Sequence, residues 1–282
     1  MRSSCATWSI APSSDLAEAW RPKWGSRTMI MGVINATPDS FSGDGIAGDR
    51  EAILRRGRQL LHEGADLVDV GGESTRPSFV PVPLEEELAR ALPAIRLLAE
   101  RTPLPLSIDT TKAEVARLAV EAGASVVNDV SGLRDDSMLD VVAGSGCGLV
   151  LVHNFSAAGQ PDVTSFVVAG LANLVQRAVR AGVAAHSLIV DPGLGFGKTW
   201  RQNLELLDRL AELKSLGLPI LIGPSRKATV SRVLGVGIND RLEGTAALVA
   251  VGIAHGADAV RVHDCLQMRR VAQMMDAVAR TV

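Results

Sequence analysis

Eight short, almost continuously apolar segments recur along the chain, and this rhythm constrains its fold more than any other feature. They cover residues 28–35, 66–72, 104–110, 125–131, 148–154, 187–193, 218–225 and 258–264. Their length and their Val, Ile and Leu content are typical of strands buried on both faces in a parallel sheet. Segments with an amphipathic, helical composition lie between several of them, as at residues 49–65, 83–101, 111–124, 201–217 and 241–257.

Strands that alternate with helices eight times predict an α/β protein with a (β/α)8 TIM barrel. A doubly wound open sheet is the alternative, but it usually has fewer strands and a glycine-rich turn after the first one. Here "NATPDSF" follows the first apolar segment. We therefore expect a single barrel domain over residues 23–282, preceded by a polar, Pro- and Ser-rich N-terminal extension over residues 1–22.

Charge and cysteine content exclude several classes of function. The formal net charge of −2 gives no reason to expect binding to nucleic acid or to a membrane surface. The longest apolar run, residues 141–152, is too short to span a bilayer. Cys5, Cys147 and Cys265 are too widely spaced for a disulfide framework or a zinc site, and they fit a cytoplasmic protein.

Polar groups follow almost every apolar segment, at the C-terminal strand ends where a TIM barrel builds its active site. These groups are Asn35, Glu73, Ser74, Thr75, Arg76, Asp109, Asn128, Asp129, His153, Asn154, Asp191, Ser225, Arg226, Lys227, Arg261, His263 and Asp264. A single Asp or Asn at such a position is more often a helix cap or a turn residue than a ligand-binding group. We interpret Asp49 and either Asp135 or Asp136 as caps of this kind. Capping alone does not explain eight ends that behave alike.

The residue types at these ends suit two chemical partners. Two carboxylates and an amide, from Asp109, Asn128 and Asp191, can hold the N–H and amino edges of a pterin-like ring. The guanidinium groups of Arg76 and Arg261 can present a fork of donors to a phosphate or diphosphate. The pattern therefore predicts a site that binds a polar ring at its bottom and a diphosphate at its rim.

Arg261 and His263 alternate with apolar residues, so we expect both to point to the barrel interior. An unpaired charge is costly there, and these side chains need an anionic partner from the protein or from a ligand.

The stretch "DPGLGFGKT", residues 191–199, ends like a nucleotide-binding P-loop. A P-loop requires glycine five residues before Gly197, where this chain has Pro192. A P-loop NTPase is therefore a weak alternative. We interpret the stretch as a strand end that offers Asp191 to a ring, with Phe196 as an apolar wall. We assign Lys198 a local role in capping or charge neutralisation, without a part in catalysis.

Seven motifs together resemble the dihydropteroate synthase family in order and spacing, from about Trp24 to the C-terminus. They are "MGVINATPDSFS", "GGESTRP", "SIDTTK", "NDVSG", "DPGLGFGK", "GPSRK" and "RVHD". The resemblance implies a (β/α)8 transferase of folate biosynthesis and a target of sulfonamides. Such an enzyme joins 6-hydroxymethyl-7,8-dihydropterin diphosphate to 4-aminobenzoate and releases diphosphate and 7,8-dihydropteroate. It also implies a homodimer formed through late helices such as residues 239–255 and 266–280.

The resemblance also implies roles for individual residues. The pterin would be held by Asp109, Asn128, Asp191 and Lys227, and the diphosphate by Asn35, Thr75, Arg76, Arg261 and His263. The 4-aminobenzoate would lie among Phe41, Arg76, Pro77, Phe196, Lys227 and Ala228. The residues expected to act in catalysis are Arg261, His263, Asp109 and Lys227. Magnesium would be the cofactor, bound near Asn35.

Three segments depart from the family pattern, and two functions on the same barrel remain as alternatives. The departures are "SFSGDG" for "SFSDGG", Ser78 for a glycine, and "HNFSAAGQPD" for "HMxGxP". One alternative is a pterin-dependent methyltransferase, which has no diphosphate to hold, so "SRK" and "RVHD" argue against it. The other is a non-catalytic or altered-substrate pterin-binding paralogue.

Helical spacing aligns Val271, Met274, Met275 and Val278 in one stripe, which is more often packed on the core than used as an interface.

Overall fold

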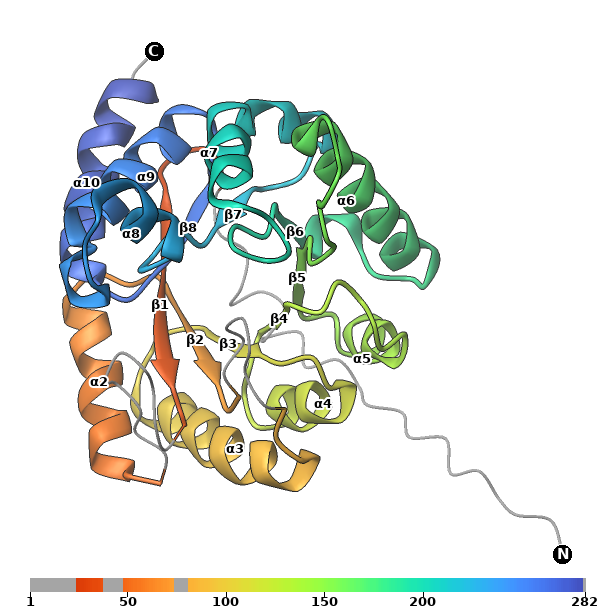
Figure 1. Cartoon of the computed structure of the whole chain (residues 1–282). Helices are drawn as coiled ribbons and strands as arrows, with labels where there is room; N and C mark the ends of the chain where they lie inside the picture. The colour runs from red at the N-terminus through yellow and green to blue at the C-terminus, as the bar shows by residue number, and fades with distance from the viewer. Residues whose placement is uncertain (1–23, 38–47, 74–80, 281–282) are drawn as a thin grey trace, which may run out of the picture.

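The computed structural model describes residues 24–37, 48–73 and 81–280, and in these ranges parallel strands alternate with helices (Figure 1). The strands are β1 (Met29–Asn35), β2 (Leu67–Gly71), β3 (Leu106–Asp109), β4 (Val126–Asp129), β5 (Gly148–Val152), β6 (Leu188–Asp191), β7 (Leu221–Ile222) and β8 (Ala259–Val262). The α-helices are α2 (Arg50–His62), α3 (Leu84–Arg101), α4 (Ala113–Glu121), α5 (Ser137–Ser145), α6 (Val163–Arg180), α7 (Trp200–Asp208), α8 (Ala228–Leu234), α9 (Leu242–Ala254) and α10 (Cys265–Ala279). All eight predicted strands are present. The expected extension, residues 1–22, lies outside the described ranges.

The sheet closes on itself. Its strands follow the order β6-β5-β4-β3-β2-β1-β8-β7, and every pair is parallel. A bridge between Val190 and Ile220 joins the two outer strands, and the Val190 N–H donates to the carbonyl of Pro219 at 3.0 Å. The predicted barrel is therefore confirmed, and the open-sheet alternative is wrong.

Alternation along each strand divides its residues between two environments. Side chains such as Ile30, Val68 and Ile108 point outward and pack under the helices in the main hydrophobic core. The positions between them point into the barrel. The inward-facing cluster of apolar side chains comprises Met31, Leu67, Val126, Val130, Val150, Val152, Ile189, Leu221 and Ala259.

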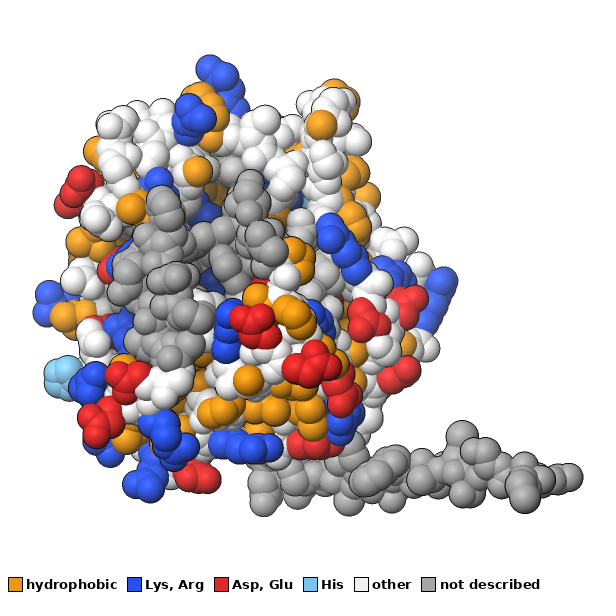
Figure 2. Space-filling view, turned by 60° about the horizontal axis from the view of Figure 1, so that its bottom comes forward, with side chains coloured by type: hydrophobic (Ala, Val, Ile, Leu, Met, Phe, Trp, Pro, Cys, Tyr) orange, Lys and Arg blue, Asp and Glu red, His pale blue; other side chains and the backbone are white. Residues whose placement is uncertain are grey.

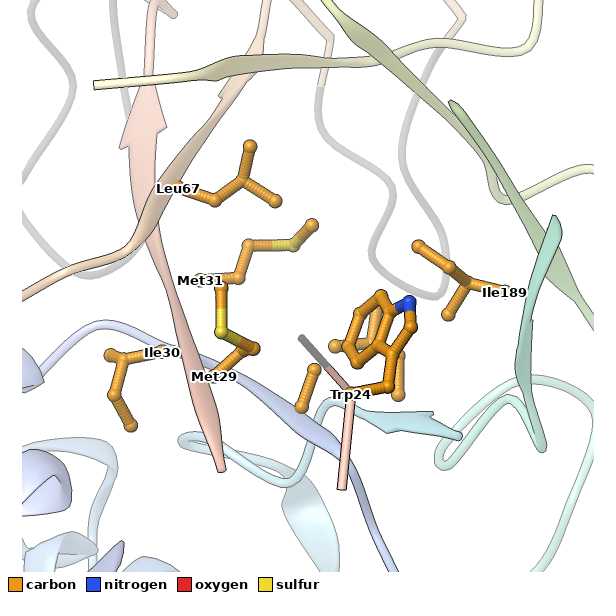
Figure 3. A pocket seen from close by; sticks show the side chains of 8 residues that line it. Trp24, Met29, Ile30, Met31, Leu67 and Ile189 are labelled. Carbon is orange, nitrogen blue, oxygen red and sulfur yellow. The ribbon is translucent and has the colours of Figure 1, made fainter. Parts of the chain in front are cut away.

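The amino end of the barrel is filled with apolar side chains, and we call this part the floor. Trp24 points among Met29, Met31, Leu67 and Ile189 there (Figure 3). The cavity they leave measures only about 10 Å³, which is too small for a ligand. The floor therefore closes the barrel from below and leaves the opposite, carboxyl end for a site.

One predicted helix, residues 201–217, is wrong in its second half. The α-helix α7 stops at Asp208, and the 3₁₀-helix η2 (Leu210–Leu216) follows. Leu210 and Leu213 are buried and Leu216 packs on the core, so the apolar side chains recur every third residue. Three residues per turn is the repeat of a 3₁₀-helix, and this winding keeps all three on one face.

The expected helix caps are partly correct. The Asp49 carboxylate accepts a hydrogen bond from the Ala52 N–H at 2.9 Å and caps α2. Asp136 stands at the start of α5 but makes no capping bond, whereas Asp135 accepts from the Ser137 N–H at 3.1 Å.

The apolar stripe predicted on the last helix, α10, divides between two environments. Val271 and Met275 pack against the core, as expected of a core-facing stripe. Met274 and Val278 are each 67% exposed, so for these two the prediction of core packing is wrong. The reason is angular: the four positions span more of the helix surface than the barrel covers.

Candidate active site

Four buried polar side chains and one half-buried arginine gather inside the barrel above the floor, and we call them the polar layer. They are Asp69 on β2, Asp109 on β3, Asn128 on β4, Asp191 on β6 and Arg261 on β8. The four acidic and amide residues are at most 7% exposed, and the Arg261 side chain is 22% exposed. In the strand register Asp109 is opposite Asn128, and Asp191 is opposite Val152. Side chains predicted from widely separated motifs therefore meet at the carboxyl end of one barrel.

Arg261 joins two carboxylates of this layer. Its Nε donates to Asp69 Oδ2 at 2.6 Å, and its Nη2 donates to Asp109 Oδ2 at 2.8 Å. The anionic partner that the sequence demands for Arg261 thus comes from the protein. Two charge-assisted bonds fix the plane of the guanidinium group.

Asp69 was not among the predicted site residues. It is completely buried, and its Oδ2 also accepts a hydrogen bond from Asn128 Nδ2 at 3.0 Å. One signal could have revealed it, because Asp69 lies two residues after the inward-facing Leu67. A carboxylate at such a position is a natural partner for a buried arginine on another strand.

Several buried acceptors of the polar layer have no hydrogen-bond partner among the described residues. They are Asp69 Oδ1, Asp109 Oδ1 and Asn128 Oδ1, and the hydroxyl of Ser107 is in the same condition. A buried polar atom without a partner is costly, and most proteins avoid it. These atoms are suited to N–H donors from a ligand.

Burial also shifts the pKa values of two carboxylic acids of the polar layer, Asp109 and Asp191. Desolvation raises the pKa of Asp109 to about 7, against the opposing charge of Arg261. Desolvation likewise raises the pKa of Asp191, against a 2.6 Å hydrogen bond from the Gly193 N–H and the charges of Lys227, Lys198 and Arg261. The influence of Arg261 on Asp191 and the hydrogen bond from Arg261 to Asp109 show that these predicted residues lie at the same end of the barrel, whereas Arg76 lies outside the described residues.

The loop after β6 is held by hydrogen bonds from the Lys198 side chain to backbone carbonyl groups, and its P-loop-like residues are not directed to a phosphate. Lys198 Nζ donates to the carbonyl oxygens of His153 (2.9 Å), Gly193 (3.2 Å) and Phe196 (2.9 Å). Thr199 is occupied in a capping box at the start of α7. Both P-loop-like residues therefore have structural tasks, in agreement with the local role predicted for Lys198. Burial lowers the pKa of Lys198 to about 7.

Gly193 shows why this loop needs glycine. Its φ is +71°, and a Cβ there would lie 2.1 Å from the carbonyl oxygen of His153. Any side chain would push the β5 and β6 ends apart.

Three of the residues predicted around 4-aminobenzoate are described. Lys227 Nζ lies 4.6 Å from the centroid of the Phe196 ring, a cation–π distance. Ala228, the first residue of α8, is exposed. The sequence did not reveal Asn203, which is buried and accepts from the Gly195 N–H at 3.0 Å while donating to Thr229 Oγ1 at 3.2 Å. It ties the loop of Phe196 to α8.

His263 lies just past the end of β8, and its ring is held from the neighbouring strand. Its Nδ1 is 3.0 Å from Ser225 Oγ, which also accepts from the His263 N–H at 3.2 Å. Arg56 of α2 donates to the His263 carbonyl at 2.7 Å. Asn35 ends the neighbouring strand β1, opposite Gly71 in the register. Phe41, Thr75, Arg76 and Pro77 lie outside the described residues.

The face toward which the β1 and β2 arrowheads point shows no patch of side chains of a single charge on its coloured part. There, Lys and Arg are mixed with Asp and Glu (Figure 2). Within the described ranges, no group of three or more His, Cys, Asp or Glu could hold a metal ion. Magnesium commonly takes one or two protein oxygens and completes its shell with water and substrate phosphates. Asn35, the last residue of β1, has an amide oxygen of this chemical type. No helix in the described part of the chain is long and apolar enough to cross a membrane.

Comparison with known proteins is consistent with this geometry. Residues 31–263 match the family model described as "Pterin binding enzyme". The dihydropteroate synthase of Clostridium beijerinckii is 42% identical over 258 residues, which is 91% of this chain and 96% of that protein.

Two solved structures share the fold. The dihydropteroate synthase of Clostridium difficile, determined in the presence of pteroic acid, has a TM-score of 0.88 and 41% identity over 92% of this chain and all of that one. That of Xanthomonas albilineans, with 4-aminobenzoic acid, has a TM-score of 0.85 and 40% identity over 92% of this chain and 95% of that one.

Proposed function

The chain belongs to the pterin-binding enzymes and, among them, to the dihydropteroate synthases, and from this premise we propose how its residues carry out the reaction. The enzyme condenses 6-hydroxymethyl-7,8-dihydropterin diphosphate with 4-aminobenzoate to form 7,8-dihydropteroate and diphosphate. The observation that carries the proposal is the polar layer, where acceptors without partners among the described residues lie beside the half-buried guanidinium group of Arg261.

The pterin is held by Asp109, Asn128, Asp191 and Lys227. The buried oxygens of Asp109 and Asn128, which lack partners in the described structure, accept from the N–H and amino groups of the ring. Asp191 adds a second carboxylate, and Lys227 adds a donor close to Phe196. Hydrogen bonds from the ring therefore compensate these buried groups for the hydrogen bonds to water that they lose on burial.

The diphosphate is held at the rim by Arg261, His263 and Asn35, with Thr75 and Arg76 from the segment outside the described residues. Arg261 offers a guanidinium fork and His263 a ring whose Nδ1 is already paired with Ser225. The other ring nitrogen, Nε2, is the atom that we propose meets a phosphate oxygen. Magnesium at Asn35 would neutralise part of the diphosphate charge when bound.

The 4-aminobenzoate lies against Phe196, Lys227 and Ala228, where Lys227 is suited to its carboxylate. Phe41, Arg76 and Pro77 complete this proposal from the segments outside the described residues. A cation over an aromatic face, as between Lys227 and Phe196, places a positive charge beside an apolar wall, which matches an aromatic ring that carries a carboxylate.

The reaction replaces one bond at the pterin methylene carbon. The amine nitrogen of 4-aminobenzoate forms a C–N bond, the C–O bond to diphosphate breaks with its electron pair, and the amine loses a proton. Arg261 and His263 stabilise the charge that grows on the departing diphosphate. The Asp109 and Asp191 carboxylates favour positive charge on the ring and its methylene group. A dissociative path with a cationic pterin is therefore the proposed route.

An assay of the purified protein tests the function and separates its alternatives. We expect 7,8-dihydropteroate and diphosphate in equal amounts, with more product when Mg²⁺ is added and less with a sulfonamide. A non-catalytic paralogue would bind the pterin without releasing diphosphate in the presence of 4-aminobenzoate. A methyltransferase would release none from any substrate.

We also propose a cytoplasmic homodimer. The free thiols Cys147 and Cys265 are buried, which suits a reducing compartment. Apolar side chains stand out from the packed pair α9 and α10, with Val251 41% exposed and Met274 and Val278 67% exposed. Analytical ultracentrifugation tests this, since Met274→Glu is expected to shift a dimer toward monomer.

A further inference from the structure

Asp69 is a buried carboxylate that the proposed reaction leaves without a task. It is 0% exposed, and it lies inside the barrel between Leu67 of the floor and the carboxyl end of β2. One oxygen, Oδ2, accepts from both Arg261 Nε (2.6 Å) and Asn128 Nδ2 (3.0 Å). A buried charge with two such partners is strongly oriented, because neither bond can be replaced by water.

The bond to Asn128 determines which end of that amide can meet a ligand. A carboxylate oxygen only accepts, so Asn128 must turn its NH₂ group toward Asp69. The opposite orientation would set two acceptors against each other at 3.0 Å. Asn128 Oδ1 therefore points away from Asp69, and it is buried without a partner among the described residues.

The bond to Arg261 serves a second purpose. In this structure Arg261 divides its donors between Asp69 and Asp109. When the N–H groups of a ring donate to Asp109, the hold of Arg261 on that carboxylate weakens. Asp69 lies deeper in the barrel, since it is opposite Ser107 whereas Asp109 is opposite Gly71, and it continues to anchor Nε and to hold the guanidinium group in place.

We propose that Asp69 is a positioning residue that sets the polarity of the pterin pocket. It turns the Asn128 amide so that only its carbonyl oxygen is offered to the ligand. It also anchors Arg261 while the ring N–H groups replace Arg261 as hydrogen-bond donors to Asp109. The inference rests on the proposed function and deepens it. With Asp109 Oδ1 and Asn128 Oδ1 adjacent in the strand register, the pocket wall selects a ring edge that carries N–H donors.

The first test compares Asp69→Val, which removes the acceptor, with Asp69→Asn, which keeps an acceptor but removes the charge. We expect the KM for pterin diphosphate to rise about 10- to 100-fold in Asp69→Val and less in Asp69→Asn, because a hydrogen bond to a charged group is lost or weakened. The KM for 4-aminobenzoate should remain within about twofold of the wild-type value. An unchanged KM for pterin diphosphate in Asp69→Val overturns the proposal.

A double-mutant cycle with Asn128→Asp gives a readout that a purely structural role would not produce. In the wild-type background Asn128→Asp sets two carboxylates against each other and should weaken pterin binding. In the Asp69→Val background the same change should strengthen it, because the introduced carboxylate presents an oxygen whichever way it turns. If Asp69→Val does not fold, the cycle uses Asp69→Asn, where Asn128→Asp should be less harmful than in the wild type. Equal losses in both backgrounds overturn the inference.

Asp66 provides the matched control on the same strand segment. It pairs with Arg27 at 2.7 Å and Arg269 at 3.3 Å at the amino end of the barrel, away from the polar layer. Asp66→Asn should lower the melting temperature without changing the KM for pterin diphosphate. A wild-type protein that forms no dihydropteroate would refute the proposed function. Activity in the wild type with no effect of Asp69→Val would refute only the role of Asp69.

Discussion

The barrel interior has an apolar floor at its amino end and a polar layer at its carboxyl end, and the same strands build both. β6 contributes Ile189 to the floor and Asp191 to the polar layer, two residues apart. The floor is satisfied by its own contacts and leaves almost no cavity. The polar layer keeps buried oxygens without partners in the described structure. The floor therefore stabilises the protein by itself, whereas the polar layer keeps buried acceptors that the proposed ligand would satisfy.

Arg261→Ala breaks the polar layer most severely. It removes the donors proposed for the diphosphate and leaves the Asp69 and Asp109 carboxylates without their shared cation. We expect turnover to fall by about 1,000-fold, as for the loss of a key electrostatic donor, while pterin binding is partly retained. Arg261→Lys keeps the charge but lacks the fork, and should lose less. Near-normal steady-state turnover in Arg261→Ala would show that the diphosphate role is wrong.

Leu221→Ala tests the floor in the same way. Leu221 is 1% exposed, and truncating it removes packing without touching the polar layer. We expect the free energy of unfolding to fall by about 2–5 kcal/mol, measured by urea denaturation. The KM for both substrates should stay near the wild-type values below the melting transition. A large rise in KM would mean that floor and polar layer are not separable.

Asp191→Asn tests whether the polar layer recognises the ring through the shape and hydrogen bonding of Asp191 or through its negative charge. The variant keeps the shape and can still accept from the Gly193 N–H. It loses the negative charge that faces Lys227, Lys198 and Arg261. Calorimetry should show pterin affinity weaker by about 10- to 100-fold, the value of a hydrogen bond to a charged group. Unchanged affinity would show that Asp191 only stabilises the turn at Gly193.

The fold and much of the site were predictable because both depend on local alternation. Apolar runs of strand length predict the barrel, and polar residues at their ends lie where barrel loops meet. Asp69 escaped this reasoning because it lies within a run and not at its end. Asn203 escaped because its role depends on how α7 approaches the loop at Gly195, which no local pattern encodes. The break at Arg209 was missed for a related reason, since tertiary burial of Leu210 and Leu213 selects the tighter helix.

The free energy of unfolding of the ligand-free protein should depend on pH in opposite ways for groups in two places. One is the polar layer, and the other is the layer of side chains packed between the strands and the surrounding helices, which we call the outer shell. Asp109 belongs to the polar layer, where desolvation raises its pKa from 3.8 to about 7. The folded state then holds a proton that the unfolded state releases, so stability falls as pH rises from about 4 to 7. In Asp109→Asn this fall should be smaller, and a pterin ligand should change it as well. Urea denaturation at several pH values measures the difference from the wild type.

His153 represents the outer shell, because its ring points from the end of β5 to α6 and lies 5.1 and 5.2 Å from the rings of Phe155 and Phe166. It is fully buried, both ring nitrogens lack partners in the described structure, and desolvation lowers its pKa from 6.5 to about 3. Stability should therefore fall as pH drops from about 6.5 toward 3, by at most about 1.4 kcal/mol per pH unit. In His153→Gln this slope should disappear, while the slope due to Asp109 persists. If both variants lost the same slope, the polar layer and the outer shell would titrate as one coupled unit, and the separation drawn between them would fail.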